Sequence, residues 1–147
     1  MGSKPFVLRP TDRKPALNVL GSHIAVLASG SDIEDQQIVA QVGDEGMGPP
    51  PHSHDWDESF YIIKGQVVFT CAGETILCTA GTLVHFPAGT VHAFRIGPGG
   101  AEMLEITGKR SNAVPMFTAL DRDIPPGPLD VAKVIDVLRQ NGVTVHT

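Results

Sequence analysis

The chain has 147 residues and a formal net charge of −5 at pH 7. A hydrophobic fraction of 41% and a charged fraction of 18% are typical of a globular protein and exclude a disordered or fibrous chain. The chain is acidic overall and contains no block of like charges. Nucleic acids and anionic membranes require a basic surface, so neither partner is expected.

The N-terminal segment up to Leu20 carries scattered charges and prolines and no continuous apolar stretch, unlike a secretory signal. No segment approaches the roughly 18 apolar residues that a membrane span needs. We therefore expect a cytoplasmic protein without a membrane anchor. The length suits one domain, which we place over residues 1–147.

Short β-rich runs follow one another between His23 and Thr107, separated by turns that contain glycine or proline. No helical period occurs among them, which predicts an all-β closed barrel or two-sheet sandwich. The predicted strands are HIAVLA, QQIVAQV, ESFYIIK, QVVFTC, TILCT, TLVHF, VHAFRI and AEMLEIT.

Two cysteines, Cys71 and Cys78, flank a hairpin turn that we predict at Ala72-Gly73-Glu74. A turn centred there would place Cys71 opposite Thr75 and Cys78 opposite Val68, and so put the two thiols on opposite faces. We therefore expect no disulfide between them.

Helix is predicted only in the tail, where residues 109–147 contain a Pro-rich linker and one helix. Asp130 stands at the N-cap position, and Gly142 suits the residue that follows the C-cap. Apolar residues between them recur at helical spacing and form one narrow stripe, made of Val131, Val134, Ile135 and Leu138. We expect this stripe to cover the outside of the barrel or a neighbouring subunit.

Four residues are candidates for metal binding. His52 and His54 lie two apart, so on an extended strand both imidazoles point to the same side. Glu58 opens the next strand, and His92 follows a Pro-Ala-Gly turn, so each could reach the same point. Three imidazoles and one carboxylate suit Fe, Mn, Ni, Co or Zn and leave open positions on an octahedral ion, which indicates a catalytic site.

The spacing of these residues resembles the two motifs of the cupin superfamily. The first motif is matched by Gly46, His52, His54, Glu58 and Gly65. The second motif is matched by Gly81, Pro87, Ala88, Gly89 and His92, while Ile96 replaces its usual closing Asn. The resemblance covers about residues 22–108 and implies a jelly-roll β-barrel that holds one divalent metal ion with His52, His54, Glu58 and His92.

The same frame predicts a substrate pocket. Alternation along a strand places Phe60 and Ile62 on the face of Glu58, and Phe94 on the face of His92. These side chains would give an apolar pocket for a small-molecule substrate, although each could equally be barrel core.

The sequence defines the roles of Trp56 and His85 less clearly. Trp56 lies between two predicted ligands, where it either walls the pocket mouth as a substrate contact or covers the turn. His85 is predicted to be a barrel histidine rather than a fifth ligand.

The chain as a whole resembles small bacterial cupins grouped with quercetin dioxygenases, which implies a metal-dependent oxygenase acting on a small phenolic or enolisable substrate. Glu58 would then serve as both metal ligand and catalytic base. Two alternatives stay open, a non-redox cyclase, lyase or isomerase and a binding protein without turnover. A homodimer is expected, formed through the N-terminal strand region and the tail helix.

Overall fold

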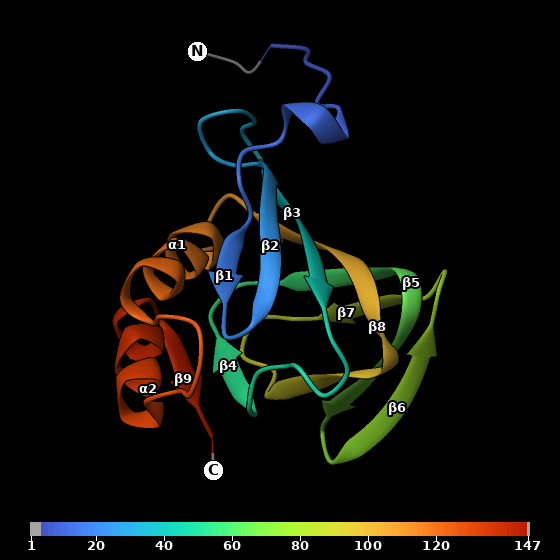
Figure 1. The fold of residues 1–147 in the computed structure, drawn as a ribbon, viewed down its shortest axis with the longest axis vertical. Coiled ribbons are helices and arrows are strands. Elements are labelled where there is room, and N and C mark those ends of the chain that lie inside the picture. Colours follow the sequence, from blue (N-terminus) through green and yellow to red (C-terminus); the bar gives the residue numbers. More distant parts are fainter. Residues whose placement is uncertain (1–3, 147) are drawn as a thin grey trace.

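The computed structural model describes residues 4–146, which form a curled sheet with two helices against one side (Figure 1). The mostly-β class and the C-terminal helix predicted from the sequence are confirmed. The strands are β1 (Leu17–Val19), β2 (Ser22–Ala28), β3 (Gln36–Gly43), β4 (His52–His54), β5 (Glu58–Cys71), β6 (Glu74–Thr79), β7 (Leu83–Phe86), β8 (His92–Gly108) and β9 (Val143–Val145). The helices are α1 (Ala113–Asp123) and α2 (Val131–Gln140), preceded near the N-terminus by a 3-10 turn at Pro10–Asp12.

Strand β8 is the centre of the sheet, because it pairs with β3, β4 and β5. The strand order runs β1-β2-β3-β8-β4-β9, and β5 joins β6 and β7 to β8. All of these pairs are antiparallel. Because His92 is the first residue of β8, the pairing of β8 connects it to both parts of the sheet.

Strands β5 and β8 are each longer than predicted, since each unites two of the expected runs. The predicted turn at Gly65 is an irregularity within β5, where the register to β8 shifts between Gly65 and Val67. Gly65 has φ +83°, and a Cβ added there would lie 2.2 Å from the Gly100 carbonyl oxygen. The glycine therefore permits two backbones to approach closely while the strand bends.

We expect Gly65→Ala to destabilise the protein strongly, because the new methyl group would collide with the backbone of β8. Gly73→Ala is the matched control, since Gly73 has a similar φ of +78° but open space around its Cβ position. The left-handed conformation alone should cost about 1–2 kcal/mol, and the clash should add about 1–3 kcal/mol at Gly65. Equal losses in urea unfolding would contradict the proposed close approach.

The hairpin between β5 and β6 corrects the prediction for the cysteines. Its turn contains two residues, Ala72 and Gly73, both with positive φ, and not three. Cys78 is therefore opposite Val67, which lies on the same face as Cys71, so the thiols share a face rather than opposing faces. Both thiols are free, as expected, because they lie at opposite ends of the hairpin.

Helix α1 was not predicted, and its presence corrects the expectation of a linker in this region. Its first turn is stabilised by groups outside the helix: the Ala113 N–H donates to the Ser111 hydroxyl (2.9 Å) and the Val114 N–H to the Gln37 side-chain oxygen (3.3 Å). Helix α2 begins as predicted, with the Asp130 carboxylate accepting from the Lys133 N–H. Within residues 4–146, neither helix is long and apolar enough to span a membrane.

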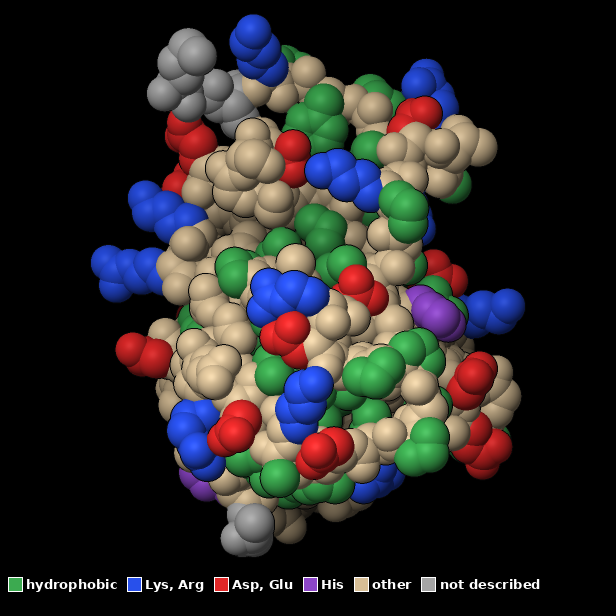
Figure 2. All heavy atoms as spheres, turned by 60° about the vertical axis from the view of Figure 1, so that its left-hand side comes forward, with side chains coloured by type: hydrophobic (Ala, Val, Ile, Leu, Met, Phe, Trp, Pro, Cys, Tyr) green, Lys and Arg blue, Asp and Glu red, His purple; other side chains and the backbone are tan. Residues whose placement is uncertain are grey.

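Two hydrophobic clusters fill the molecule. The first packs α1 and α2 against β1, β2 and β3, so the helices cover this face of the sheet. The second fills the barrel and contains four phenylalanines, Phe60, Phe69, Phe86 and Phe94. Figure 2 turns the helical side forward and shows basic and acidic side chains interspersed with apolar ones on that face.

Candidate metal centre

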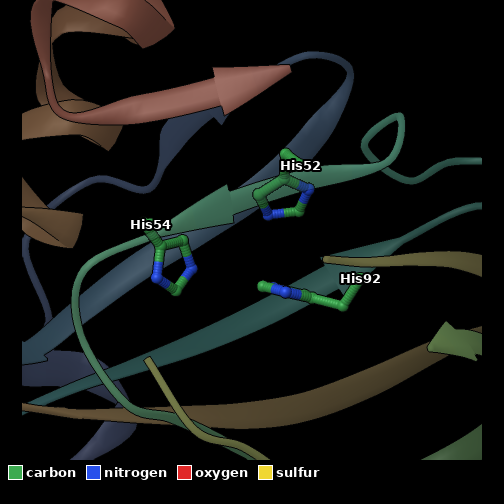
Figure 3. Close-up of side chains that lie close together, drawn as sticks. All are labelled: His52, His54 and His92. Carbon is green, nitrogen blue, oxygen red and sulfur yellow. The ribbon is translucent and has the colours of Figure 1, made fainter. Parts of the chain in front are cut away.

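Three histidines from two strands converge on one point. His52 and His54 extend from the same face of β4, and His92, the first residue of β8, is the register partner of His52. One ring nitrogen from each of the three lies within 4.8 Å of the others. Figure 3 shows the three imidazoles turned toward a common centre, as the His-x-His spacing predicts.

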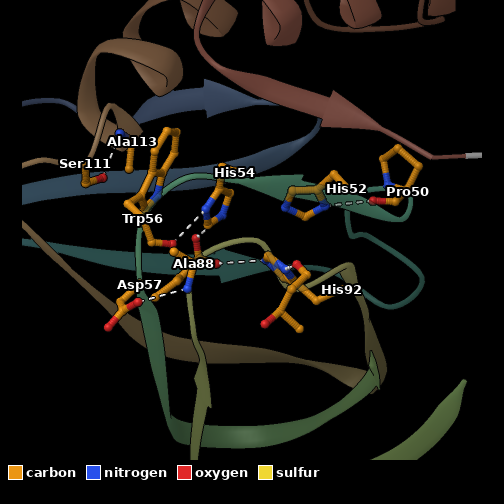
Figure 4. Close-up of polar contacts among 11 residues, drawn as sticks. Pro50, His52, His54, Trp56, Asp57, Ala88, His92, Ser111 and Ala113 are labelled. Carbon is orange, nitrogen blue, oxygen red and sulfur yellow. Dashed lines mark hydrogen bonds and ion pairs between the residues drawn. The ribbon is translucent and has the colours of Figure 1, made fainter. Parts of the chain in front are cut away.

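Each imidazole is oriented by a hydrogen bond to the backbone. Its Nδ1 pairs with a carbonyl oxygen two residues away in the sequence (Figure 4). The acceptors are Pro50 for His52 at 2.8 Å, Trp56 for His54 at 3.0 Å and Thr90 for His92 at 2.9 Å. Because a carbonyl can only accept, Nδ1 carries the proton in each ring and Nε2 presents a lone pair, the form that binds a metal.

The elements that carry the histidines are tied together. The Ala88 N–H donates to the Asp57 carboxylate and the Gly89 N–H to the His54 carbonyl, both at 2.8 Å, so the turn before His92 is fixed against the β4–β5 connection. On the other edge, β9 pairs with all of β4, with Val143 opposite His54. The C-terminal segment thus supports the strand that carries two of the histidines.

Glu58, the first residue of β5, completes the cluster. Its carboxylate oxygens lie 2.9 Å from Nε2 of His54 and 3.5 Å from Nε2 of His92, and only 5% of the residue is exposed. Buried lone pairs on nitrogen and oxygen cannot hydrogen-bond to one another, so a proton or a cation must lie between them. Nε2 of His54 and of His92 are buried without a hydrogen-bond partner, which fits a shared metal ion.

Burial and mutual charge set the protonation of the cluster. Burial, assisted by His92, lowers the pKa of His52 to about 4. Burial favours the neutral form of Glu58, but His54 and His92 outweigh it and lower the pKa of Glu58 to about 2. Burial also lowers the pKa of His92, yet hydrogen bonding and attraction to Glu58 outweigh it, so the pKa of His92 is raised.

We expect metal affinity to fall as the pH is lowered, since a proton on His92 competes with the cation. Below the raised pKa of His92, the apparent affinity for Zn²⁺ should drop by about tenfold per pH unit. Isothermal titration calorimetry in buffers of different ionisation enthalpy should show that protons are released when Zn²⁺ binds at about pH 6. An affinity that does not change with pH in this range would contradict a role for His92 as ligand.

A largely apolar cavity adjoins the cluster, between the sheet and the two helices. Its walls include His52, His54 and Glu58 on one side and Met116, Phe117, Leu120 and Leu138 from the helices on another. Of the predicted substrate contacts, Phe94 lines this cavity. Phe60 and Ile62 are almost completely buried in the second hydrophobic cluster and are not among the lining residues.

Trp56 and His85 are not among the residues that line the cavity. The Trp56 ring stacks on the His54 imidazole, with centroids 4.2 Å apart and planes 8° from parallel, and it packs in the first hydrophobic cluster. The stacking holds His54 in place, and a contact between Trp56 and the substrate stays a prediction. His85 is exposed and hydrogen-bonds to the Ser59 hydroxyl at 2.7 Å, so it is neither a ligand nor part of the barrel interior.

Residues 38–107 match the family of cupin domains. This stretch is a cupin domain. Over 96 residues the chain is 29% identical to quercetin 2,3-dioxygenase of Bacillus subtilis (strain 168), an alignment that covers 65% of this chain but only 28% of that enzyme.

Two solved structures show the same fold at lower identity. The polyketide cyclase RemF of Streptomyces resistomycificus is 20% identical with a TM-score of 0.63, over 72% of this chain and 80% of that one. KdgF of Halomonas sp. is 17% identical with a TM-score of 0.67, over 76% and 99% of the two chains. These likenesses concern the fold alone.

Three buried polar residues of the site lie outside the sequence motifs. Ser22, Gln41 and Glu105 line the cavity and are each less than 10% exposed. Burial raises the pKa of Glu105 well above its usual range, and the neighbouring Glu58 carboxylate raises it further. A signal for Glu105 was present in the sequence, since it alternates with Met103, and a carboxylate on an inward face is rarely without function.

Proposed function

We propose that this cupin is a metal-dependent oxygenase that acts on a small phenolic or enolisable substrate. The observation that carries the proposal is the convergence of three Nε2 lone pairs and the Glu58 carboxylate beside a largely apolar cavity. The partial similarity to a quercetin 2,3-dioxygenase supports the same reaction class.

His52, His54, His92 and Glu58 would together hold one divalent ion. The donor set of imidazole nitrogens and one carboxylate suits Fe, Mn, Ni, Co or Zn. A redox-active ion held there would supply open positions for the oxygens of the substrate and the capacity for electron transfer to O₂, whereas Zn would supply Lewis acidity alone.

The residues of the chain supply orientation, proton transfer and exclusion of water. The Nδ1 hydrogen bonds hold the three imidazoles in position. Glu58 has two carboxylate oxygens, so one can remain a ligand while the other accepts the proton of a substrate hydroxyl group. The apolar side chains of α1 and α2 would keep water from the activated substrate.

Oxygen uptake tests the proposal. Protein loaded separately with Fe²⁺, Mn²⁺, Ni²⁺, Co²⁺ or Zn²⁺ should be assayed with quercetin and with small hydroxypyranones. Substrate-dependent O₂ uptake with a redox-active ion, and none with Zn²⁺, is expected. Product formation without O₂ would instead establish the non-redox cyclase, lyase or isomerase, and tight binding without turnover would establish a binding protein.

We also propose a homodimer, as is common for this barrel. Apolar side chains are exposed on the N-terminal segment and near the start of α2, namely Phe6, Val7, Leu129 and Val131. Light scattering after size-exclusion chromatography would give the mass of the assembly, and a monomer mass would reject this proposal.

A further inference from the structure

The cavity beside the metal centre has a second polar wall. Ser22 on β2, Gln41 on β3 and Glu105 on β8 belong to three adjacent strands. Ile24 is the register partner of Gln41, and Gln41 is the partner of Met103, so Ser22 and Glu105 each lie two residues further along and face the same side. Their polar atoms therefore enter the cavity from one face of the sheet.

These groups are almost completely buried, and Glu105 lies beside the Glu58 carboxylate. Ser22 is 3% exposed, Gln41 6% and Glu105 5%. Within the described residues, Oε2 of Glu105 is buried without a hydrogen-bond partner. Leaving such an atom unpaired in a buried site is unfavourable, so it favours a ligand that supplies the missing partner.

The charge of the cavity restricts the ligand further. Glu58 and Glu105 both border it, and among the described residues no Lys or Arg side chain lines it. A carboxylate on the substrate would lie near Glu105 without a basic partner, which is unfavourable in a buried site. A neutral hydroxyl group can both donate and accept, and so can pair with the Gln41 amide or with the Glu105 carboxyl group.

We propose that Ser22, Gln41 and Glu105 form a specificity site for a neutral hydroxyl group of the substrate other than the oxygens that bind the metal. The inference rests on the proposed chelation of the substrate by the metal. It narrows the substrate class to compact, neutral molecules that carry a chelating oxygen pair and a further hydroxyl group.

Three hydroxypyranones with the same chelating oxygens test this site. Kojic acid carries a remote hydroxymethyl group, allomaltol a methyl group and comenic acid a carboxylate at the same ring position. Their affinities for the Zn²⁺-loaded protein can be measured by isothermal titration without O₂, so that no oxidation occurs. Kojic acid should bind about tenfold more tightly than allomaltol, and comenic acid most weakly.

Two variants assign the preference to the polar wall. Gln41→Leu and Glu105→Leu should each reduce the ratio of kojic acid to allomaltol affinity to about three or less while allomaltol binding is retained. Gln36→Leu is the control, because Gln36 is exposed on the same strand as Gln41. Zn²⁺ content and thermal unfolding should be measured for each variant.

The specificity site would be rejected if the wild type bound kojic acid and allomaltol equally, if both variants kept the preference, or if none of the three compounds bound. If the proposed oxygenase function were wrong, the result would be different. Loss of the proposed reaction would leave no O₂ uptake with any metal, while the order of affinities among the three compounds would persist.

Discussion

Replacing His92 by alanine is expected to abolish metal binding. His92 is 2% exposed, faces His52 across the β4–β8 pair, and presents Nε2 to the common centre. Loss of a group that only orients a ligand lowers metal affinity by about 10–100-fold, so loss of a ligand should cost at least about 100-fold. Elemental mass spectrometry and Zn²⁺ titration of protein without an affinity tag would measure the effect.

The control for this change is His85→Ala. His85 is an exposed histidine on β7 whose ring contacts Ser59 rather than the cluster, so its removal should leave metal content near that of the wild type. Metal retention by His92→Ala at the affinity of the wild type would show that the three histidines do not form a metal site. Equal losses in both variants would indicate a general effect on the fold.

The metal cluster was predictable because its determinants are mostly local. His52 and His54 share a face by strand periodicity, and Glu58 follows within one short connection. The approach of His92 depends on long-range pairing, which alternation cannot supply. It could be predicted only from the resemblance to the cupin motifs, and the β4–β8 register then places it opposite His52.

Features that depend on tertiary contacts were harder to predict from the sequence. Helix α1 contains Pro115 in its first turn, lacks a side-chain cap from its own N-cap Asn112, and takes support from Gln37 on a strand far away in the sequence. Such support leaves no local pattern of helix capping. The second polar wall is equally non-local, because its members come from three strands that only the sheet brings together.

The full lengths of β5 and β8 could not be predicted for a different reason. Glycine usually marks a turn, and the sequence was interpreted in that way at Gly65 and at Gly97–Gly100. In the structure the chain continues through both segments, because β5 and β8 bend there and remain paired, with Gly65 opposite Ala101. A glycine needed for close approach of two backbones cannot be distinguished locally from one needed for a turn.

Glu58→Gln is expected to separate metal binding from turnover. The amide keeps one oxygen donor and the size of the side chain, while His52, His54 and His92 remain, so metal content should stay near that of the wild type. The amide cannot accept a proton as the carboxylate does, so substrate-dependent O₂ uptake should fall by about 10²–10⁴-fold. Initial rates on matched metal-loaded samples would measure this loss.

Glu74→Gln is the matched control, since Glu74 is exposed on β6 and the substitution removes the same charge away from the cavity. Oxygen uptake that survives Glu58→Gln with metal bound would remove Glu58 from proton transfer and leave it at most a ligand. Loss of both metal and activity would show that the charge of the Glu58 carboxylate is needed for metal binding. Retained metal with a lost rate, together with an unchanged Glu74→Gln, would assign the proton transfer to Glu58, because the two variants differ only in where the same charge is removed.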